Sequence, residues 1–466
     1  MDGSRQYFLC GIGGSGMLPL ALILRAAGHA VEGSDRALDQ GRTGAKFEFL
    51  KSKGIALHPQ DGSGITSAEQ TLVASAAVED TVPDVAAARR LGAQRMTRAE
   101  LLAQLFNAAP VSIGVAGTSG KSTTTGMIGW ILHEAGKKPT VMNGAVMKNF
   151  VTPEALFASA LVGDGGIFVS EVDESDGSIA NFDPSIAVLN NISLDHKTMD
   201  ELRRLFGEFV AKSDVAILNL DNDETKTLSA SIVAGRKRTY SLGDSSADYL
   251  AENISPRPFG ISFDVIERAS GERANVALKM PGRHNVSNAL ASIAAANAAG
   301  VDFVFASHAL ESFAGVKRRL EFIGEKSGVI VIDDFGHNPD KISASLKTLH
   351  EFPGRLLIMF QPHGFGPLKK MKDEFVACFA ENLQTGDILV MPEPVYYGGT
   401  TDKSVSSEDI AVGVSAAGRR AKAFPTRSEC GDFIVSEAHS GDRIVVMGAR
   451  DDTLSEFAGE LLSRIG

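Results

Sequence analysis

The chain has 466 residues and a formal net charge of −11, with 44% hydrophobic and 22% charged residues. This composition is typical of soluble globular proteins, and the length predicts two to four domains at roughly 100–200 residues per domain. The acidic balance argues against a general nucleic-acid binder and against adhesion to anionic membranes, because both need a basic surface.

The three cysteines, Cys10, Cys378 and Cys430, are scattered and show no CxxC spacing. We therefore expect neither a disulfide framework nor a structural zinc site. The N-terminus runs into only a short apolar strand, and no stretch approaches about 18 uninterrupted apolar residues. The sequence predicts a cytoplasmic protein without a signal peptide or membrane insertion.

Short apolar strands alternate with amphipathic helices in three successive blocks, which is the pattern of parallel βαβ sheets. The first block contains a strand around Tyr7–Cys10 and ends in a linker at Asn107–Pro110, since proline disfavours helix in the residue before it. We expect an α/β protein with three domains in series, at 1–107, 108–315 and 316–466. Helices are predicted near 17–27, 99–106 and 121–135, and strands near 73–75, 111–116, 166–172, 186–190, 215–220, 261–266, 274–280, 329–332, 355–360, 388–391 and 443–447.

The first glycine-rich turn, Gly11-Ile12-Gly13-Gly14-Ser15-Gly16, follows a strand and opens a helix. Such glycines permit a tight turn and bring backbone N–H groups close to a pyrophosphate. Asp35 ends the next predicted strand, where a carboxylate can meet a ribose hydroxyl. The turn fits a nicotinamide cofactor, another nucleotide diphosphate, or a purely structural tight turn.

The second glycine-rich turn, Gly117-Thr118-Ser119-Gly120-Lys121-Ser122, resembles a P-loop between a strand and a helix. In such loops the backbone amides cradle phosphates, the lysine neutralises them, and the hydroxyl of Ser122 can bind Mg²⁺. The loop departs from the usual pattern at Val115, where a first glycine is expected.

Polar side chains follow two further strands of the second block. Glu171 begins an acidic run that extends to Asp176 after a buried strand, and Asp195-His196 follows the next one. Carboxylates at the carboxyl ends of parallel strands lie where such sheets bind ligands, and Mg²⁺ prefers hard oxygens. The alternatives are a solvated acidic loop and an exposed or structural histidine.

Two later groups carry polar residues suited to a nucleotide. His284, Asn285 and Asn288 start a predicted helix and can contact a base or merely cap the helix. The triplet Lys317-Arg318-Arg319 can hold phosphates or form a solvated face.

Taken in order, these segments resemble the Mur ligases, which add amino acids or peptides to UDP-muramyl precursors of the bacterial cell wall. The resemblance covers nearly the whole chain and implies a Rossmann-like first domain, a P-loop ATPase-type central domain and a Rossmann-like third domain. It rests on residues 11–17, 33–35, 116–125, 171–176, 195–196, 282–288, 318–319, 333–337 and 360–363.

The resemblance implies an ATP- and Mg²⁺-dependent ligase that forms an amide bond through an acyl phosphate, in peptidoglycan synthesis. Its N-terminal pattern is similar to the branch that acts on UDP-N-acetylmuramate, with L-alanine as acceptor or, alternatively, the recycled tripeptide L-Ala-γ-D-Glu-meso-diaminopimelate. We expect a monomer or weak homodimer.

The family also implies roles for individual residues. Catalytic roles fall to Lys121, Glu171, His196, Arg319, His337 and His363, and metal binding to Ser122, Glu171 and His196. The nucleotide would meet Gly117, Thr118, Ser119, Gly120, Lys121, Ser122, Thr123, His284, Asn285, Asn288, Arg319 and Asp334. The UDP part would meet Gly11, Gly13, Gly14, Ser15, Gly16, Asp35 and Ser75.

The chain departs from the family pattern most clearly at the acceptor. L-alanine ligases place two arginines just beyond Gln-Pro-His, where this chain has Gly364 and Pro367. The nearby Lys369 and Lys370 are no equivalent of a bidentate arginine grip on a carboxylate. Asn338 also stands where a second histidine is usual, and Ser122 replaces the usual threonine.

Two other function classes compete with a ligase. A nicotinamide-dependent dehydrogenase would use the first turn and Asp35, but it leaves Lys121 and Glu171 without a role. A non-catalytic ATP-binding regulator would bind nucleotide without turnover, and the missing arginines agree with it. The retained Lys121, Ser122, Glu171 and His196 favour the ligase.

Overall fold

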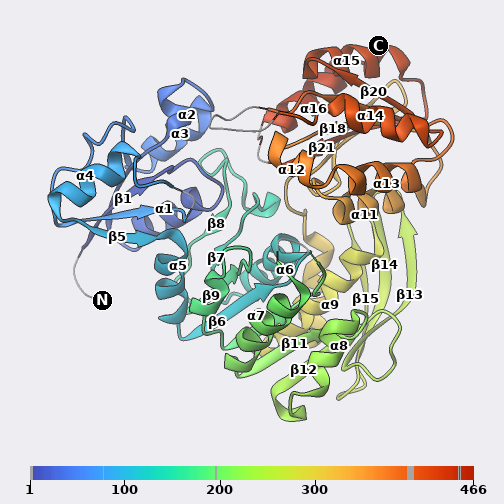
Figure 1. Cartoon of the computed structure of the whole chain (residues 1–466). Coiled ribbons are helices and arrows are strands. Elements are labelled where there is room, and N and C mark those ends of the chain that lie inside the picture. Colours follow the sequence, from blue (N-terminus) through green and yellow to red (C-terminus); the bar gives the residue numbers. More distant parts are fainter. Residues whose placement is uncertain (1–3, 77, 195–196, 396–402, 450, 452) are drawn as a thin grey trace. The chain divides into compact units, whose positions relative to one another are not determined.

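Three sheets organise the chain in this computed structural model, which describes residues 4–76, 78–194, 197–395, 403–449, 451 and 453–466 (Figure 1). Residue contacts divide the chain into two compact units. The first unit contains the first sheet and most of the second. The second unit comprises residues 317–466 with the short segments 256–261 and 280–283, which include the adjoining ends of two strands of the second sheet. The predicted α/β fold with three successive sheets is confirmed.

The first sheet has the strand order β3-β2-β1-β4-β5, and all its neighbouring strands are parallel. The order changes direction beside β1, and ligands bind at such switch points in open α/β sheets. The strands are β1 (Gln6–Cys10), β2 (Ala30–Ser34), β3 (Ala56–His58), β4 (Gln70–Ala74) and β5 (Gln94–Thr97). The helices are α1 (Met17–Ala26), α2 (Arg36–Asp39), α3 (Gly44–Ser52), α4 (Pro83–Leu91) and α5 (Arg98–Asn107).

The second sheet has the order β15-β14-β13-β12-β11-β10-β6-β9-β7-β8. Its central strands β10, β6 and β9 are parallel neighbours and nearly fully buried, as expected for strands with helices on both faces. Two residues join β13 to β14, a connection that makes a hairpin. The two-residue strand β8 was not predicted, because so short a segment has no detectable periodicity.

The strands of this sheet are β6 (Val111–Ala116), β7 (Thr140–Met142), β8 (Ala160–Leu161), β9 (Ile167–Glu171), β10 (Ile186–Leu189), β11 (Val215–Asn219), β12 (Lys237–Ser241), β13 (Tyr249–Arg257), β14 (Gly260–Glu267) and β15 (Arg273–Leu278). The helices are α6 (Lys121–Glu134), α7 (Met199–Lys212), α8 (Asp223–Ala230), α9 (Arg283–Ala298) and α10 (Phe303–Ala309).

The third sheet has the order β16-β17-β21-β18-β19-β20, parallel except for the antiparallel pair β16–β17. The strands are β16 (Glu321–Lys326), β17 (Val329–Asp334), β18 (Leu356–Gln361), β19 (Ile388–Pro392), β20 (Arg420–Phe424) and β21 (Arg443–Gly448). The helices are α11 (Pro339–His350), α12 (Phe365–Lys370), α13 (Lys372–Asn382), α14 (Ser407–Ala416), α15 (Arg427–Glu437) and α16 (Thr453–Arg464).

The three cysteines are free thiols and are buried. Burial raises the pKa of each thiol to about 12, for Cys10, Cys378 and Cys430 alike. Within the ranges that the structure describes, no helix combines the length and the apolar character needed to cross a membrane.

Candidate active site

The P-loop connects the end of β6 at Ala116 to the start of α6 at Lys121, and its conformation depends on two glycines. Gly117 has φ 127° and Gly120 has φ 86°, both in the left-handed region. A Cβ atom on Gly120 would lie 2.5 Å from Asn288 Oδ1 and 2.7 Å from Asn190 Nδ2. Glycine at position 120 is therefore required both by the backbone and by the space available.

Asn191, just after β10, holds the loop from one side. Its side-chain oxygen accepts a hydrogen bond from Ser119 N at 2.9 Å, and its carbonyl oxygen accepts one from Thr118 N at 3.2 Å. The Thr118 hydroxyl donates to Ser193 O at 3.1 Å. The loop is thus fixed to the carboxyl end of the neighbouring strand, where ligands bind in such sheets.

The first two residues of α6 each contact a carboxylate of the acidic run. The Ser122 hydroxyl donates to Glu171 Oε2 at 2.9 Å, and Lys121 Nζ lies 3.0 Å from Glu174 Oε2. Lys121 Nζ also donates to Gly117 O at 2.7 Å. Because β9 lies beside β6, the end of β9 brings these carboxylates to the P-loop.

The oxygens of Ser122 and Glu171 are suited to a Mg²⁺ ion. They already lie within hydrogen-bond distance, and the other Glu171 oxygen accepts from the N–H of Gly144. Asn143 fixes the same region by donating from Nδ2 to Ser122 O at 2.8 Å. Across the described part of the chain, no three His, Cys, Asp or Glu side chains converge as a metal site, but Mg²⁺ commonly uses one or two protein oxygens and keeps water.

Helix α9 places two amides beneath the P-loop. Asn285 and Asn288 are buried, and Asn288 Oδ1 accepts from the Thr124 hydroxyl at 3.3 Å. The Nδ2 group of Asn288 donates to Asn285 Oδ1 at 3.2 Å. His284 is exposed in the first turn of α9. The amides therefore support α6 and the loop.

The glycine-rich turn after β1 is anchored to β2 and to Asp35. Gly13 N donates to Asp35 Oδ2 at 2.8 Å, while Asp35 Oδ1 caps α2 by accepting from Ala37 N at 2.8 Å. Ser34 O accepts from Gly11 N at 2.8 Å. Asp35 thus fixes the shape of the turn, in addition to the ribose contact predicted for it.

A cavity of about 270 Å³ in the first unit joins the two glycine-rich turns. A second cavity of about 240 Å³ includes Ser75 in its lining. Arg98 lines both cavities, and a Cβ atom on Gly16 would lie 3.1 Å from its side chain. The lining of the larger cavity includes Ser15, Gly16, Arg98, Lys121, Asn143, Gly144, Glu171 and Asp173.

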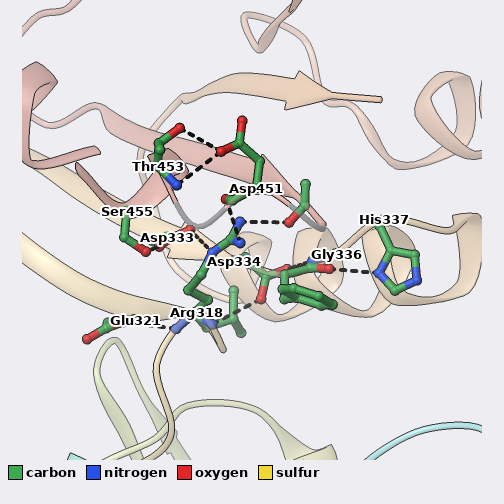
Figure 2. Close-up of polar contacts among 12 residues, drawn as sticks. Arg318, Glu321, Asp333, Asp334, Gly336, His337, Asp451, Thr453 and Ser455 are labelled. Carbon is green, nitrogen blue, oxygen red and sulfur yellow. Dashed lines mark hydrogen bonds and ion pairs between the residues drawn. The ribbon is translucent and has the colours of Figure 1, made fainter. Parts of the chain in front are cut away.

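In the second unit, a polar network surrounds Arg318 at the ends of β17 and β21 (Figure 2). The guanidinium contacts Asp333 and donates from Nη2 to Gly448 O at 2.7 Å. Asp334 is buried and accepts from Leu320 N at 3.0 Å and from the Ser345 hydroxyl at 2.7 Å. The next residue, Arg319, lies with its guanidinium 4.9 Å from the ring centre of Phe335.

His337 and His363 face each other in the same unit, with ring centres 5.4 Å apart in an edge-on arrangement. His337 Nδ1 donates to Phe335 O at 3.0 Å, since a carbonyl oxygen can only accept. Burial, together with the positive charges of Lys341 and Arg319, lowers the pKa of His337 to about 3. His337 is therefore neutral near pH 7, and Nε2 carries its lone pair.

The structure brings several of the predicted site residues together within the first unit. The P-loop, Ser122 and Glu171 share the larger cavity or its edge with Ser15 and Gly16, and Ser75 lines the smaller cavity. His196 falls outside the described residues. Arg319, Asp334, His337 and His363 belong to the second unit.

The sequence did not indicate that Asn143, Glu174 and Asn191 lie around the loop or that Arg98 lines both cavities. Glu174 was part of the acidic run, but its spacing did not distinguish it from its neighbours. Arg98 begins a helix after a short strand, which gave no signal of a binding residue.

Three family descriptions match successive parts of the chain. "Mur ligase family, catalytic domain" matches residues 7–109, "Mur ligase middle domain" matches residues 115–296, and "Mur ligase, glutamate ligase domain" matches residues 318–450. The matches follow the order of the three sheets.

Relatives and solved structures agree with these matches. A UDP-N-acetylmuramate–L-alanine ligase of Desulfosudis oleivorans is 36% identical, over 96% of this chain and 95% of its own length. One of Agrobacterium fabrum is 34% identical over 98% and 96%. The solved UDP-N-acetylmuramate–alanine ligase of Thermotoga maritima has the same fold, with a TM-score of 0.79 at 24% identity over 98% of both chains.

A murein peptide ligase of Psychrobacter arcticus superimposes with a TM-score of 0.73 at 26% identity, over 99% of both chains. The matches thus extend over almost the entire sequence, and the full-length relatives exceed 30% identity. The chain belongs to the Mur ligase family and is an ATP-dependent ligase that forms a carbon–nitrogen bond.

Proposed function

We propose that this chain joins L-alanine to UDP-N-acetylmuramate through an amide bond, with conversion of ATP to ADP and phosphate, in peptidoglycan precursor synthesis. The observation that carries the proposal is the 270 Å³ cavity, because it is lined both by the turn after β1 and by Lys121 and Glu171. A donor held by its UDP part and an ATP phosphate can meet in such a space. The 36% identity to a UDP-N-acetylmuramate–L-alanine ligase over 96% of the chain supports the choice of substrates.

In the proposed reaction, a carboxylate oxygen of the donor attacks the γ-phosphorus of ATP, and ADP leaves. The amine of the acceptor then attacks the acyl phosphate, releases phosphate and loses a proton. Lys121, which lines the cavity, would stabilise the charge on the transferred phosphoryl group. Ser122 and Glu171 would hold Mg²⁺, which would neutralise charge on the phosphates, and His196 is proposed as a further ligand.

The UDP part is assigned to the turn at Gly11, Gly13, Gly14, Ser15 and Gly16, with Asp35 and Ser75. Backbone N–H groups at the start of α1 attract the pyrophosphate, and Arg98 adds a positive charge beside Gly16. ATP is assigned to the P-loop residues from Gly117 to Thr123. Further nucleotide contacts are proposed for His284, Asn285, Asn288, Arg319 and Asp334.

The acceptor is assigned to the second unit, at His337 and His363. The neutral His337 has its Nε2 lone pair available, because Nδ1 donates to Phe335 O. That nitrogen can accept a hydrogen bond from the attacking amine.

A recycled murein tripeptide is the second candidate acceptor. Two observations favour it: Gly364 and Pro367 replace the arginines expected for an alanine carboxylate, and a murein peptide ligase superimposes with a TM-score of 0.73. A tripeptide is longer than alanine, so its carboxylates would reach cations other than the two missing arginines.

The test is phosphate release from ATP and Mg²⁺ with UDP-N-acetylmuramate, comparing L-alanine with L-Ala-γ-D-Glu-meso-diaminopimelate. Turnover with alanine is the expected result. Turnover with the tripeptide alone would replace alanine by the peptide acceptor. ATP binding without turnover on either acceptor would contradict both ligase assignments.

We further propose a cytoplasmic location and a monomer or weak homodimer. ATP and UDP-linked sugars are anions that do not cross membranes unaided, so their enzyme has to work where they are made. Fractionation of cells and light scattering of the purified protein test the two assignments.

A further inference from the structure

Lys121 and Glu174 form an ion pair inside the first unit. Lys121 Nζ lies 3.0 Å from Glu174 Oε2, and the two side chains are 19% and 5% exposed. The same ammonium group donates to Gly117 O at 2.7 Å. Both acceptors hold the ammonium at the P-loop, and the low exposure means that solvent screens the pair only weakly.

The neighbouring residue, Ser122, also contacts a carboxylate. Its hydroxyl donates to Glu171 Oε2. Two consecutive residues of α6 therefore contact two carboxylates of the acidic run. Of these two pairs, only Ser122 with Glu171 consists entirely of oxygen ligands that a metal cation could bind. In the other pair, the positive charge of Lys121 already balances the negative charge of Glu174. Metal binding therefore does not explain why Glu174 lies at this position.

A terminal phosphate of ATP and the Glu174 carboxylate require the same ammonium group. P-loop lysines reach the β- and γ-phosphates, and two anions that share one cation at short range repel each other. Nucleotide binding therefore has to weaken the contact between Lys121 and Glu174. Breaking a buried ion pair opposes the affinity gained from the phosphate.

We propose that Glu174 is a positioning residue that acts through Lys121. It holds the ammonium against Gly117 until ATP binds and then gives it up to the terminal phosphates. The inference rests on the proposed function, in which Lys121 binds those phosphates.

The experiment is calorimetric titration of the full-length protein with the non-hydrolysable analogue AMP-PNP and Mg²⁺, and separately with AMP. Glu174→Gln keeps the size of the side chain but removes the competing charge. We expect AMP-PNP to bind about tenfold more tightly, as hydrogen bonds to charged groups are worth about that factor. AMP affinity should stay the same, because AMP lacks the terminal phosphates.

Asp176→Asn is the matched control for net charge. Asp176 lies two residues further in the same loop and accepts from Ser178 N at 2.9 Å. Its neutralisation should change AMP-PNP affinity by less than the Glu174 variant does. An equal change in both variants would reduce the effect to overall charge and overturn the role of Glu174.

The KM for ATP gives a second measurement. A purely structural role for Glu174 would raise this KM when the residue is changed, whereas competition for Lys121 lowers it. If Glu174→Gln does not fold, Glu174→Asp shortens the carboxylate by one methylene and should shift AMP-PNP affinity in the same direction. Weaker AMP-PNP binding in a folded variant overturns the inference.

Lys121→Ala separates this inference from the proposed function. If that variant binds AMP-PNP as tightly as the wild type, the assignment of Lys121 to the phosphates is wrong. If it binds more weakly while Glu174→Gln fails to bind more tightly, only the role of Glu174 is wrong.

Discussion

Arg318 Nε lies 3.3 Å from Asp333 Oδ1, and the two side chains are 8% and 0% exposed. The guanidinium also donates to the carbonyl oxygens of Gly448 and Asp451. Figure 2 shows Asp451 beside Arg318. Burial raises the pKa of Asp333, and Arg318 opposes that shift. Of the two arginines in the basic triplet, Arg318 is therefore a structural residue of the second unit.

Arg318→Met should destabilise the second unit by about 3–5 kcal/mol, because it leaves Asp333 buried without its counter-ion. Urea unfolding followed by circular dichroism measures the change. The single tryptophan, Trp130, lies in the first unit, so its fluorescence identifies which transition moves.

The control for this variant is Arg420→Met. Arg420 pairs with Glu437 at 3.2 Å, but its side chain is 52% exposed. An exposed pair contributes about 1 kcal/mol or less. Equal effects of the two substitutions would contradict a structural role for Arg318.

Lys121→Ala should leave the fold intact and abolish ADP release, through loss of charge stabilisation at the γ-phosphate. Coupled detection of ADP measures turnover, and circular dichroism measures the fold. Wild-type turnover in the folded variant would disprove the catalytic role of Lys121.

Ser122→Ala should raise the Mg²⁺ concentration needed for half-maximal turnover by at least roughly 10- to 100-fold, because even a group that only orients a metal ligand contributes that factor to metal affinity. Ser122→Thr retains the hydroxyl and should restore the wild-type requirement. A Mg²⁺ titration of ATP turnover compares them. An unchanged requirement in the alanine variant would remove Ser122 from the proposed metal site.

Gly120→Ala should abolish ATP binding, because the added methyl group would overlap Asn288 and Asn190 at a residue with φ 86°. Gly136→Ala is the matched control: it has φ 69° and no atom within 4 Å of an added Cβ. The control should lose only about 1–2 kcal/mol of stability, from backbone strain, and bind ATP normally. Loss of ATP binding in both variants would mean that strain alone explains the effect.

His337 should make stability depend on pH in the acidic range. Its pKa is lowered to about 3 in the folded protein, from 6.5, so the unfolded chain binds the proton more tightly. The stabilisation is complete above about pH 6.5 and is lost as the pH falls toward 3, by about 1.4 kcal/mol for each unit of pKa shift. His337→Gln should flatten this part of the profile of unfolding free energy against pH. A slope equal to that of the wild type would show that other groups produce it.

The sequence predicted the strands best where they are buried on both faces. The segment at 111–116 coincides with β6, since only Ser112 and Gly114 interrupt its apolar residues and it is bounded by a proline and a glycine-rich turn. The antiparallel strand β16 was not predicted, because it is partly exposed and contains polar residues and a glycine. Partly buried edge strands lack the apolar periodicity on which prediction depends.

The site was predictable only where motif residues are close along the chain. The P-loop and the turn after β1 could be located, because each is one strand–turn–helix unit. The pairing of Lys121 with Glu174 spans 53 positions and depends on β9 lying beside β6, which spacing does not encode. The support given by Asn191 to Ser119 spans 72 positions and depends in the same way on β10.

The three buried thiols make the protein suitable for site-specific labelling. A thiol reacts as its thiolate, and a pKa of about 12 leaves on the order of one molecule in 10⁵ ionised at pH 7. Asp200 has a 93% exposed side chain, so Asp200→Cys would provide an accessible thiol. A maleimide dye should therefore react at this one position, without prior replacement of Cys10, Cys378 and Cys430.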